Sequence, residues 1–171
     1  HLGGFAWVSI QPLIDKALAD SDERVREGAV YALCEMNDGF AFQKLAQALK
    51  NDTSNVKLAA AWALRECQDP AAVPVLAATL QCDDPEVRVQ TLESLGFNGS
   101  TTAVSLTQTA LDDSDPEVKY AAVLSLLELT GEYALPIVTA LVQSTSGAAR
   151  ESVLKGIFHA TNYLGIDLTT P

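Results

Sequence analysis

Residues 83–96 read Asp83-Asp84-Pro85-Glu86-Val87-Arg88-Val89-Gln90-Thr91-Leu92-Glu93-Ser94-Leu95-Gly96, and their pattern of acidic, apolar and basic residues recurs on both sides. The recurrence has a period of 31 residues without an insertion, and the positions equivalent to Val87 are Val25, Val56, Val118 and Ala149. We call these five positions the anchors. A period between about 20 and 50 residues is typical of stacked arrays, in which each unit buries its apolar surface only against its neighbours.

Three further positions keep their character in all five units. The residue after the anchor is basic: Arg26, Lys57, Arg88, Lys119 and Arg150. Aliphatic residues lie seven positions before the anchor (Leu18, Leu49, Leu80, Leu111 and Val142) and eight after it (Leu33, Leu64, Leu95, Leu126 and Ile157). The unbroken array predicts one domain over residues 1–171, with units at 11–41, 42–72, 73–103, 104–134 and 135–165. Residues 1–10 are then either the remnant of a preceding unit or a leader segment.

Each unit begins with a segment whose apolar residues have helical spacing, as Val73, Leu76 and Leu80 do. This spacing predicts an α-helix, which we call the A helix. Pro12 is expected near the start of the first A helix, where a missing N–H costs little. A short polar turn such as Cys82-Asp83-Asp84 ends the A helix, and its acidic residues are placed to cap a second helix.

The second helix of each unit, the B helix, carries the anchor. The anchor and the positions four and eight residues later share one side of a helix, so we expect Val56, Ala60 and Leu64 to face the core. Small neighbours such as Ala59 let helices of adjacent units approach closely. The sequence therefore predicts an all-α, right-handed solenoid, or superhelix, of five two-helix units with the B helices on its concave side.

The charge balance narrows the classes of partner. Asp and Glu outnumber Lys and Arg by 22 to 11, which gives a net charge of −11. Phosphate backbones and anionic lipids reward clustered basic residues, so nucleic acid and membrane are predicted not to be partners. Cys34, Cys67 and Cys82 are an odd number without C-x-x-C spacing, which favours a reducing compartment. With no secretory signal evident, we expect a cytoplasmic protein.

The pattern A-L-x-D-x-D-x-x-V-R-x-x-A-x-x-A-L is legible within Leu13–Leu33 and, in part, within Val75–Leu95. It resembles HEAT-like repeats, and the 31-residue spacing is similar to that of the short repeats of phycobilisome-lyase type. The resemblance covers nearly the whole chain and is specific for the fold. It is less specific for function, because such repeats serve as scaffolds, adaptors and chaperone-like subunits as well as in bilin attachment or removal.

The resemblance also implies a role for the basic residue that follows each anchor. In such repeats it lies along the stack and bonds to turn aspartates of an adjoining unit. We carry this role onto Arg26, Lys57, Arg88, Lys119 and Arg150 as a structural ladder. The last unit departs from the pattern, because Gly147-Ala148 replaces Pro-Glu and its turn contains no acidic residue.

Few residues are suited to catalysis or metal binding. His159 is the one histidine away from the amino terminus, and its place on the surface side of its helix favours a solvated or capping role over a catalytic one. Cys34 and Cys67 are interpreted as small buried residues, with a cluster shared with a partner as the alternative. We therefore predict no catalytic residues, no metal and no cofactor.

The B-helix face opposite the core is less polar than an exposed surface should be. Positions two and six after the anchor point about 200° and 240° from it, away from the core direction near 50°. Together with their acidic rim, these positions give the predicted partner-binding residues: Tyr31, Leu58, Trp62, Val89, Glu93, Tyr120, Leu124, Glu35, Glu66 and Glu128. Aromatic residues inside an acidic rim are typical of a binding surface. Coverage by neighbouring helices is the alternative.

Two functions follow from this surface. The first is a non-catalytic scaffold or adaptor that docks a protein partner, basic or helical in character, on the concave B-helix surface. The second is a phycobilin lyase subunit, or a bilin-detaching or chaperone-like factor, in which Trp62 and Tyr120 stack on a tetrapyrrole. A bilin also needs basic residues for its propionates, and Arg65 and Lys155 are the ones near that face. We therefore favour the first function, with no enzymatic activity and no small-molecule ligand.

Overall fold

A computed structural model describes residues 5–36, 38–67, 71–163 and 165, without the side chains of 5–9 and 67. Within these residues the regular structure is helical throughout. The helices are α1 (Phe5–Leu18), α2 (Glu23–Met36), α3 (Gly39–Asn51), α4 (Ser54–Cys67), α5 (Ala72–Thr79), α6 (Pro85–Asn98), α7 (Thr101–Ala110), α8 (Pro116–Thr130), the 3₁₀ helix η1 (Gly131–Ala134), α9 (Leu135–Ser144) and α10 (Gly147–Tyr163).

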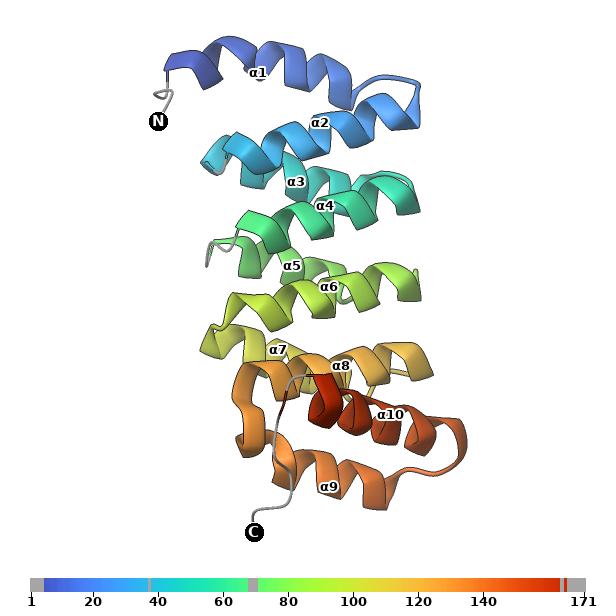
Figure 1. The fold of residues 1–171 in the computed structure, drawn as a ribbon. Helices are drawn as coiled ribbons and strands as arrows, with labels where there is room; N and C mark the ends of the chain where they lie inside the picture. The colour runs from blue at the N-terminus through green and yellow to red at the C-terminus, as the bar shows by residue number, and fades with distance from the viewer. Residues whose placement is uncertain (1–4, 37, 68–70, 164, 166–171) are drawn as a thin grey trace.

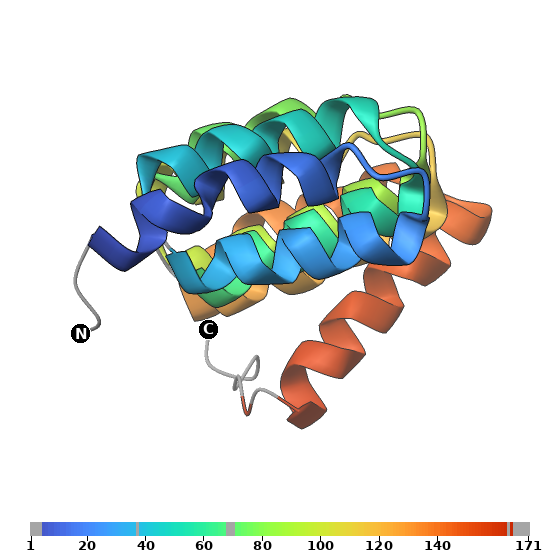
Figure 2. The ribbon, with the colours of Figure 1, turned by 90° about the horizontal axis from the view of Figure 1, so that it is seen from above.

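The helices alternate between two layers that run along one stack (Figure 1). The even-numbered helices are the B helices, and α2, α4, α6, α8 and α10 contact one another in that order. The odd-numbered A helices lie behind them, and Figure 2 shows the two layers from above. The all-α solenoid predicted from the 31-residue repeat is thus confirmed.

Polar turns start the B helices as their residue types predict. Asp84 Oδ1 accepts a hydrogen bond of 3.0 Å from the Glu86 backbone N–H, and Asp115 Oδ1 accepts one of 2.8 Å from Glu117. Each carboxylate thereby satisfies a first-turn amide that has no partner within the helix. Gly99 ends α6 with a φ of 71°, a left-handed conformation that glycine adopts without strain.

The core consists of columns of equivalent residues. The anchors Val56, Val87 and Val118 are fully buried. Seven residues after its anchor, Ser94 Oγ donates to the carbonyl of Ala61 on the preceding B helix at 3.0 Å, and Ser125 Oγ donates to that of Leu92 at 2.8 Å. A side chain this small at this position lets neighbouring B helices pack closely.

The first unit differs from the prediction in two ways. The helix that contains Pro12 begins at Phe5, so this proline lies inside α1 and not near its start. The anchor Val25 is 40% exposed and does not face the core. It lies at the end of the stack, where no B helix before α2 is present in the described residues to cover it (Figure 1).

The last unit leaves the regular stack at α10. In Figure 2, α10 is inclined to the other B helices and leaves their layer on the side away from the A helices. The helices α10 and α8 cross at Gly156, where an added Cβ would lie 2.9 Å from Val123 Cγ1 and 3.3 Å from the Tyr120 carbonyl oxygen. Glycine thus permits a close crossing, which brings the C-terminal half of α10 over the side chains of α8.

Among the residues that the structure describes, one segment has the length and apolar composition of a membrane span. It covers Pro116–Ser144, with a mean hydropathy of 1.4 over its most apolar window. The segment consists of α8, η1 and α9, and 44% of that window is buried within the protein. The part of it in α8 lies between α6 and α10.

Candidate functional site

The predicted partner-binding residues come from four consecutive B helices. They are Tyr31 and Glu35 on α2, Leu58, Trp62 and Glu66 on α4, Val89 and Glu93 on α6, and Tyr120, Leu124 and Glu128 on α8. Tyr31, Trp62 and the acidic residues Glu35, Glu66 and Glu128 are exposed, and the other five are half-buried. We call this set the concave surface. Its parts differ in character along the stack.

At the end nearest the N-terminus, two aromatic side chains form an exposed pair. The rings of Tyr31 and Trp62 lie 5.4 Å apart in an edge-to-face arrangement with an interplanar angle of 74°. They remain 47% and 39% exposed. A hollow of about 250 Å³ lies beside them and is lined by Glu27, Tyr31, Asn55, Leu58, Ala59, Trp62 and Gln90. The pair is pre-organised by its own ring contact and is open to solvent.

In the middle of the concave surface the side chains are less exposed than the ring pair. Val89 and Leu124 are half-buried and pack against the core, so coverage by neighbouring helices applies to them in part. Gln90 Nε2 donates to Glu93 Oε2 at 3.1 Å and fixes this carboxylate on α6. These residues connect the aromatic pair to the far end of the surface.

At the end nearest the C-terminus, Tyr120 is not an open surface residue. Its hydroxyl lies 2.6 Å from His159 Nδ1, and the His159 ring lies 4.4 Å from the Tyr163 ring. The solvated or capping role expected for His159 is therefore wrong, because α10 crosses α8 obliquely and brings this half-buried ring onto Tyr120. The C-terminal half of α10 forms a wall at this end of the concave surface.

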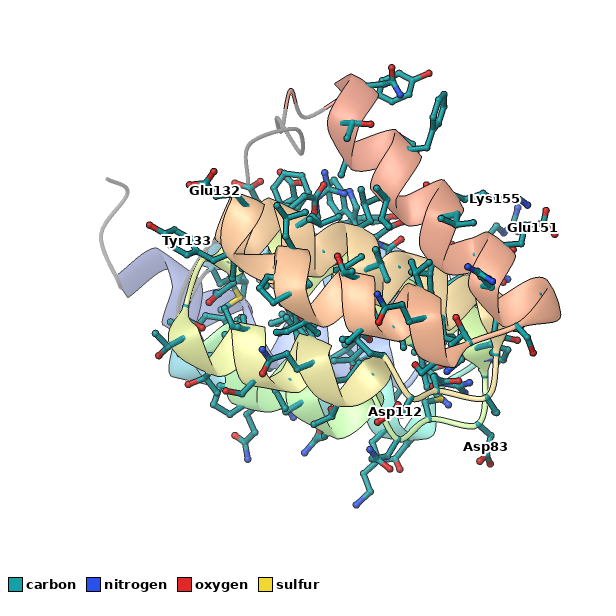
Figure 3. The ribbon with its side chains drawn as sticks, turned by 90° about the horizontal axis from the view of Figure 1, so that it is seen from below. Asp83, Asp112, Glu132, Tyr133, Glu151 and Lys155 are labelled. Carbon is teal, nitrogen blue, oxygen red and sulfur yellow. The ribbon has the colours of Figure 1, made fainter. Side chains whose placement is uncertain are left out.

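A larger hollow of about 870 Å³ opens between α8 and α10. Its lining is Glu117, Tyr120, Gly147, Arg150, Glu151, Ser152, Leu154, Lys155, Phe158, His159 and Tyr163. Lys155 Nζ contacts Glu151 Oε1 at 2.9 Å, and Figure 3 shows both side chains together on the outer side of α10. Arg150 is exposed and makes no ion pair with any described residue.

The carboxylate of Glu128 is held against α6. Burial raises the pKa of Glu128, the negative charge of Glu93 raises it further, and Arg65 acts in the opposite direction. Although Glu128 as a whole is exposed, a Cβ at Gly96 would lie 2.6 Å from Glu128 Oε2, so the carboxylate covers the space that this glycine leaves. Burial also raises the pKa of Tyr120, and Glu117, Glu93 and Glu128 add to this effect.

Sequence reasoning missed several aromatic residues near this surface. Phe97 is 52% exposed, and the Arg65 guanidinium lies 3.9 Å from its ring centroid. Phe97 has the same repeat position as Glu35 and Glu66, ten residues after the anchor, so the alignment of units could have revealed it. The positions of Phe158 and Tyr163 beside α8 depend on the direction of α10, which the repeat pattern does not specify.

The basic residues after the anchors form an ion-pair ladder in two units. Arg26 donates to both oxygens of Asp52, and Arg88 donates to both oxygens of Asp113 at 2.9 Å. Burial opposes ionisation of Asp113, yet hydrogen bonds from Arg88 and the Asp115 N–H lower its pKa overall. Each arginine also donates to carbonyls of the turn before its own helix.

The other three ladder positions differ from the expectation. Lys57 Nζ lies 3.8 Å from Cys82 Sγ, because a cysteine occupies the position that Asp113 has two helices later. Lys119 donates to the Leu111 carbonyl within its own unit, since the equivalent turn of the next unit, Ser144-Thr145-Ser146, contains no acidic residue. Arg150 has no following unit among the described residues.

The cysteines and acidic residues of the described region do not converge on a metal site. Within it, no group of three or more His, Cys, Asp or Glu side chains could hold a metal ion. The Cys34 thiol donates to the Ala63 carbonyl at 3.4 Å, and Cys82 is half-buried beside Lys57. The side chain of Cys67 lies outside the described residues.

Comparisons with known proteins extend this description. No curated protein matches the chain. Among solved structures, it is similar to the complex of CpcE and CpcF of phycocyanin lyase from Nostoc sp. PCC7120, with a TM-score of 0.61, 21% identity, and coverage of 91% of this chain and 66% of that chain. It is also similar to human deoxyhypusine hydroxylase in complex with glycerol, with a TM-score of 0.66, 20% identity, and coverage of 91% and 65%.

The chain thus spans just under two thirds of the length of either structure, and at these identities the likeness shows the fold alone. The sequence comparison is more specific. A family profile described as HEAT repeats matches residues 10–84 and 73–157, two overlapping ranges that include all five anchors. The resemblance found in the sequence is confirmed, and the chain belongs to the HEAT repeat family.

Proposed function

We propose that the chain is a non-catalytic scaffold or adaptor that binds a protein partner on the concave surface. The observation that carries the proposal is the exposed ring pair of Tyr31 and Trp62. Large aromatic side chains contribute most to binding energy when a partner buries them, and their few rotatable bonds keep the entropic cost low. The ring contact between Tyr31 and Trp62 holds both side chains in place, and the exposed part of each ring is available to a partner.

The charges beside the ring pair support a partner of basic character. Glu27 lines the hollow at Tyr31, and Glu35 and Glu66 lie exposed on the same two B helices. Acidic residues around an apolar centre select a complementary partner and accelerate association, and they contribute less to the affinity itself. The similar structure that contains CpcE and CpcF is a complex of two proteins, which is consistent with this role.

Capture experiments with matched variants test the proposal. The wild-type chain, the double variant Tyr31→Ala and Trp62→Ala, and Tyr133→Ala are immobilised as baits. Tyr133 is 82% exposed on η1 at a distant edge of the molecule (Figure 3), so it controls for the loss of any exposed ring. We expect the captured amount of at least one protein to fall about tenfold with the double variant and to stay unchanged with Tyr133→Ala. Equal capture by all three baits, with unchanged helical circular dichroism, would contradict the proposal.

A second candidate function is a bilin-handling subunit or chaperone-like factor. It is favoured by one observation: the hollow between α8 and α10 combines the rings of Tyr120, Phe158 and His159 with the cations Arg150 and Lys155. Rings and cations together suit a planar ligand that carries carboxylates. Added phycocyanobilin should then change its visible absorbance in the presence of the chain, and Lys155→Ala should reduce the change. An unaltered spectrum eliminates this candidate.

A further inference from the structure

We infer that copies of this chain associate head to tail, so that α2 of one copy docks on α10 of another. These two helices are the first and the last B helices that the structure describes. Each leaves uncovered one half of the contact that neighbouring B helices make elsewhere in the stack. The two halves are complementary, which selects a second copy as the occupant. The inference concerns the ends of the stack and does not depend on the partner proposed for the concave surface.

The uncovered half on α2, which we call the head, is the face that meets the preceding B helix in later units. It consists of the anchor and the residues three and seven positions after it: Val25, Gly28 and Ala32. Val25 and Gly28 are exposed, and Ala32 is half-buried. The equivalent residues of α4 and α8 are at most 5% exposed: Val56, Ala59, Ala63, Val118, Ala121 and Ser125. The head is therefore a packing face that lacks its neighbouring helix among the described residues.

The uncovered half on α10, which we call the tail, is the face that meets the following B helix in earlier units. The residue five positions after the anchor is fully buried in the first four units: Val30, Ala61, Leu92 and Val123. On α10 this residue is Leu154, which is 48% exposed, and Phe158 one turn later is 66% exposed. Arg150, Leu154 and Phe158 also line the hollow between α8 and α10. A docked copy would therefore compete with the planar ligand of the second candidate function.

The contact between α8 and α10 shows how a tail meets a head. Val123 of α8 and Gly156 of α10 lie five and seven residues after their anchors, and a Cβ at Gly156 would lie 2.9 Å from Val123 Cγ1. The corresponding residues between two copies are Leu154 and Ala32. The small side chain of Ala32 permits the close approach of helices that this position requires.

The ladder supplies the charge complementarity. Asp20 has the repeat position of Asp113, and Oδ1 of each accepts a hydrogen bond of 2.9 Å from the backbone N–H two residues later. Arg88 of the preceding unit pairs with Asp113, whereas Asp20 makes no ion pair with any described residue. Arg150 has the repeat position of Arg88 and likewise has no such partner. A bidentate pair between Arg150 of one copy and Asp20 of another would continue the ladder.

Neither end of the stack has the polar outer face of a capping unit. Such a face is what keeps the end units of a repeat array soluble. Here the head and the tail are apolar apart from one unpaired charge each, and the two charges are opposite. An apolar face with a single open charge is suited to a partner that covers both, and the other end of the same molecule has the matching residues.

Sedimentation velocity of the full chain tests the inference. Because head and tail are different surfaces, each associated copy keeps one of them free. The average sedimentation coefficient should therefore rise with protein concentration and pass the value of a dimer. Gly28→Arg blocks the head and Leu154→Glu blocks the tail, both at exposed residues. Each variant alone should stay monomeric with unchanged helical circular dichroism, and an equal mixture of the two should form a dimer and stop there.

Charge reversal tests the pair between Arg150 and Asp20. Arg150→Asp and Asp20→Arg should each weaken self-association about tenfold, and a chain that carries both substitutions should recover most of it. Lys50→Asp is the control, because it makes the same change of charge at an exposed residue of α3, away from both ends. This variant should associate as the wild type does.

Three results would overturn the inference. They are a wild-type sedimentation coefficient that does not change with concentration, self-association of the chain with the blocked tail, and an effect of Arg150→Asp that Asp20→Arg does not reverse. None of them bears on the proposed function, because the capture experiment depends on Tyr31 and Trp62.

Discussion

At the scale of single residues, two contacts carry opposite electrostatic consequences. Arg88 and Asp113 join adjacent units through two hydrogen bonds of 2.9 Å, and their side chains are only 12% and 15% exposed. The Glu128 carboxylate is also partly withdrawn from water, but after burial the largest effect on its pKa is the like charge of Glu93, which raises it. The first contact stabilises the stack, whereas the second lowers the stability of the folded chain at neutral pH.

Removing the ladder arginine should therefore cost more than removing a surface arginine. We expect Arg88→Ala to lower the free energy of unfolding by about 2 kcal/mol, since it leaves Asp113 partly buried without its partner. Arg24→Ala is the matched control, because the Arg24–Asp22 pair is 86% and 44% exposed. That loss should be below about 0.5 kcal/mol. Urea denaturation measures both, and equal losses would show that the ladder is not structural.

The ladder also predicts a pH dependence. The pKa of Asp113 is lowered in the folded chain, so the stabilisation is fully present above the ordinary aspartate pKa of about 3.9 and is lost as the pH falls through the folded value. The difference in the free energy of unfolding between wild type and Arg88→Ala should therefore shrink as the pH falls. A difference that stays constant from neutral to acidic pH would contradict this assignment.

Neutralising Glu128 should have the opposite sign. Its folded pKa is raised, so the folded chain loses stability as the pH rises from the ordinary glutamate pKa of about 4.3 through the folded value. We expect Glu128→Gln to stabilise the chain at neutral pH by about 0.5 kcal/mol, a figure reduced for the exposure of the side chain. The gain should vanish in acid. Glu35→Gln is the control, because Glu35 has the same repeat position and is exposed on α2. This substitution should change the free energy of unfolding little at either pH.

At the scale of helices, the repeat predicted the regular elements and missed the exceptions. A column pattern reports contacts that every unit makes, which is why Val56, Val87 and Val118 are buried as expected. The path of α10 depends on contacts made once, at Gly156 and between His159 and Tyr120. Val25 is likewise 40% exposed at the end of the stack. The repeat pattern did not predict this exposure, because it does not show which units have a neighbour on both sides.

The crossing of α10 over α8 gives a prediction at this scale. In Gly156→Ala the new Cβ meets Val123 and the Tyr120 backbone, so α10 must shift. We expect the free energy of unfolding to fall by about 1–2 kcal/mol and the NMR chemical shifts of the His159 ring to change. Gly28→Ala on α2 is the control, because nothing lies within 4 Å of its added Cβ. That variant should gain about 0.5–1 kcal/mol from helix propensity. Similar effects of both substitutions would show that the close crossing is not required.

At the scale of the whole molecule, the two kinds of turn lie at opposite edges of the stack. The turn residues Asp83 and Asp112 lie along one edge of the stack, whereas Glu132 and Tyr133 lie at the opposite edge (Figure 3). The concave surface extends from the ring pair of α2 and α4 to the wall of α10. The sequence located the ring pair by its repeat position, but it could not show that His159 and Tyr163 close the other end, because that needs the path of α10.

Site-specific photo-cross-linking tests the central claim, that a protein partner occupies the concave surface. Benzoylphenylalanine replaces Trp62 on α4, Tyr133 on η1 or the exposed Thr102 on the A helix α7 in three otherwise identical chains. After irradiation with the captured partner, we predict a covalent adduct from position 62 and none from positions 133 and 102. Adducts from position 102 or 133 without one from position 62 would contradict the claim.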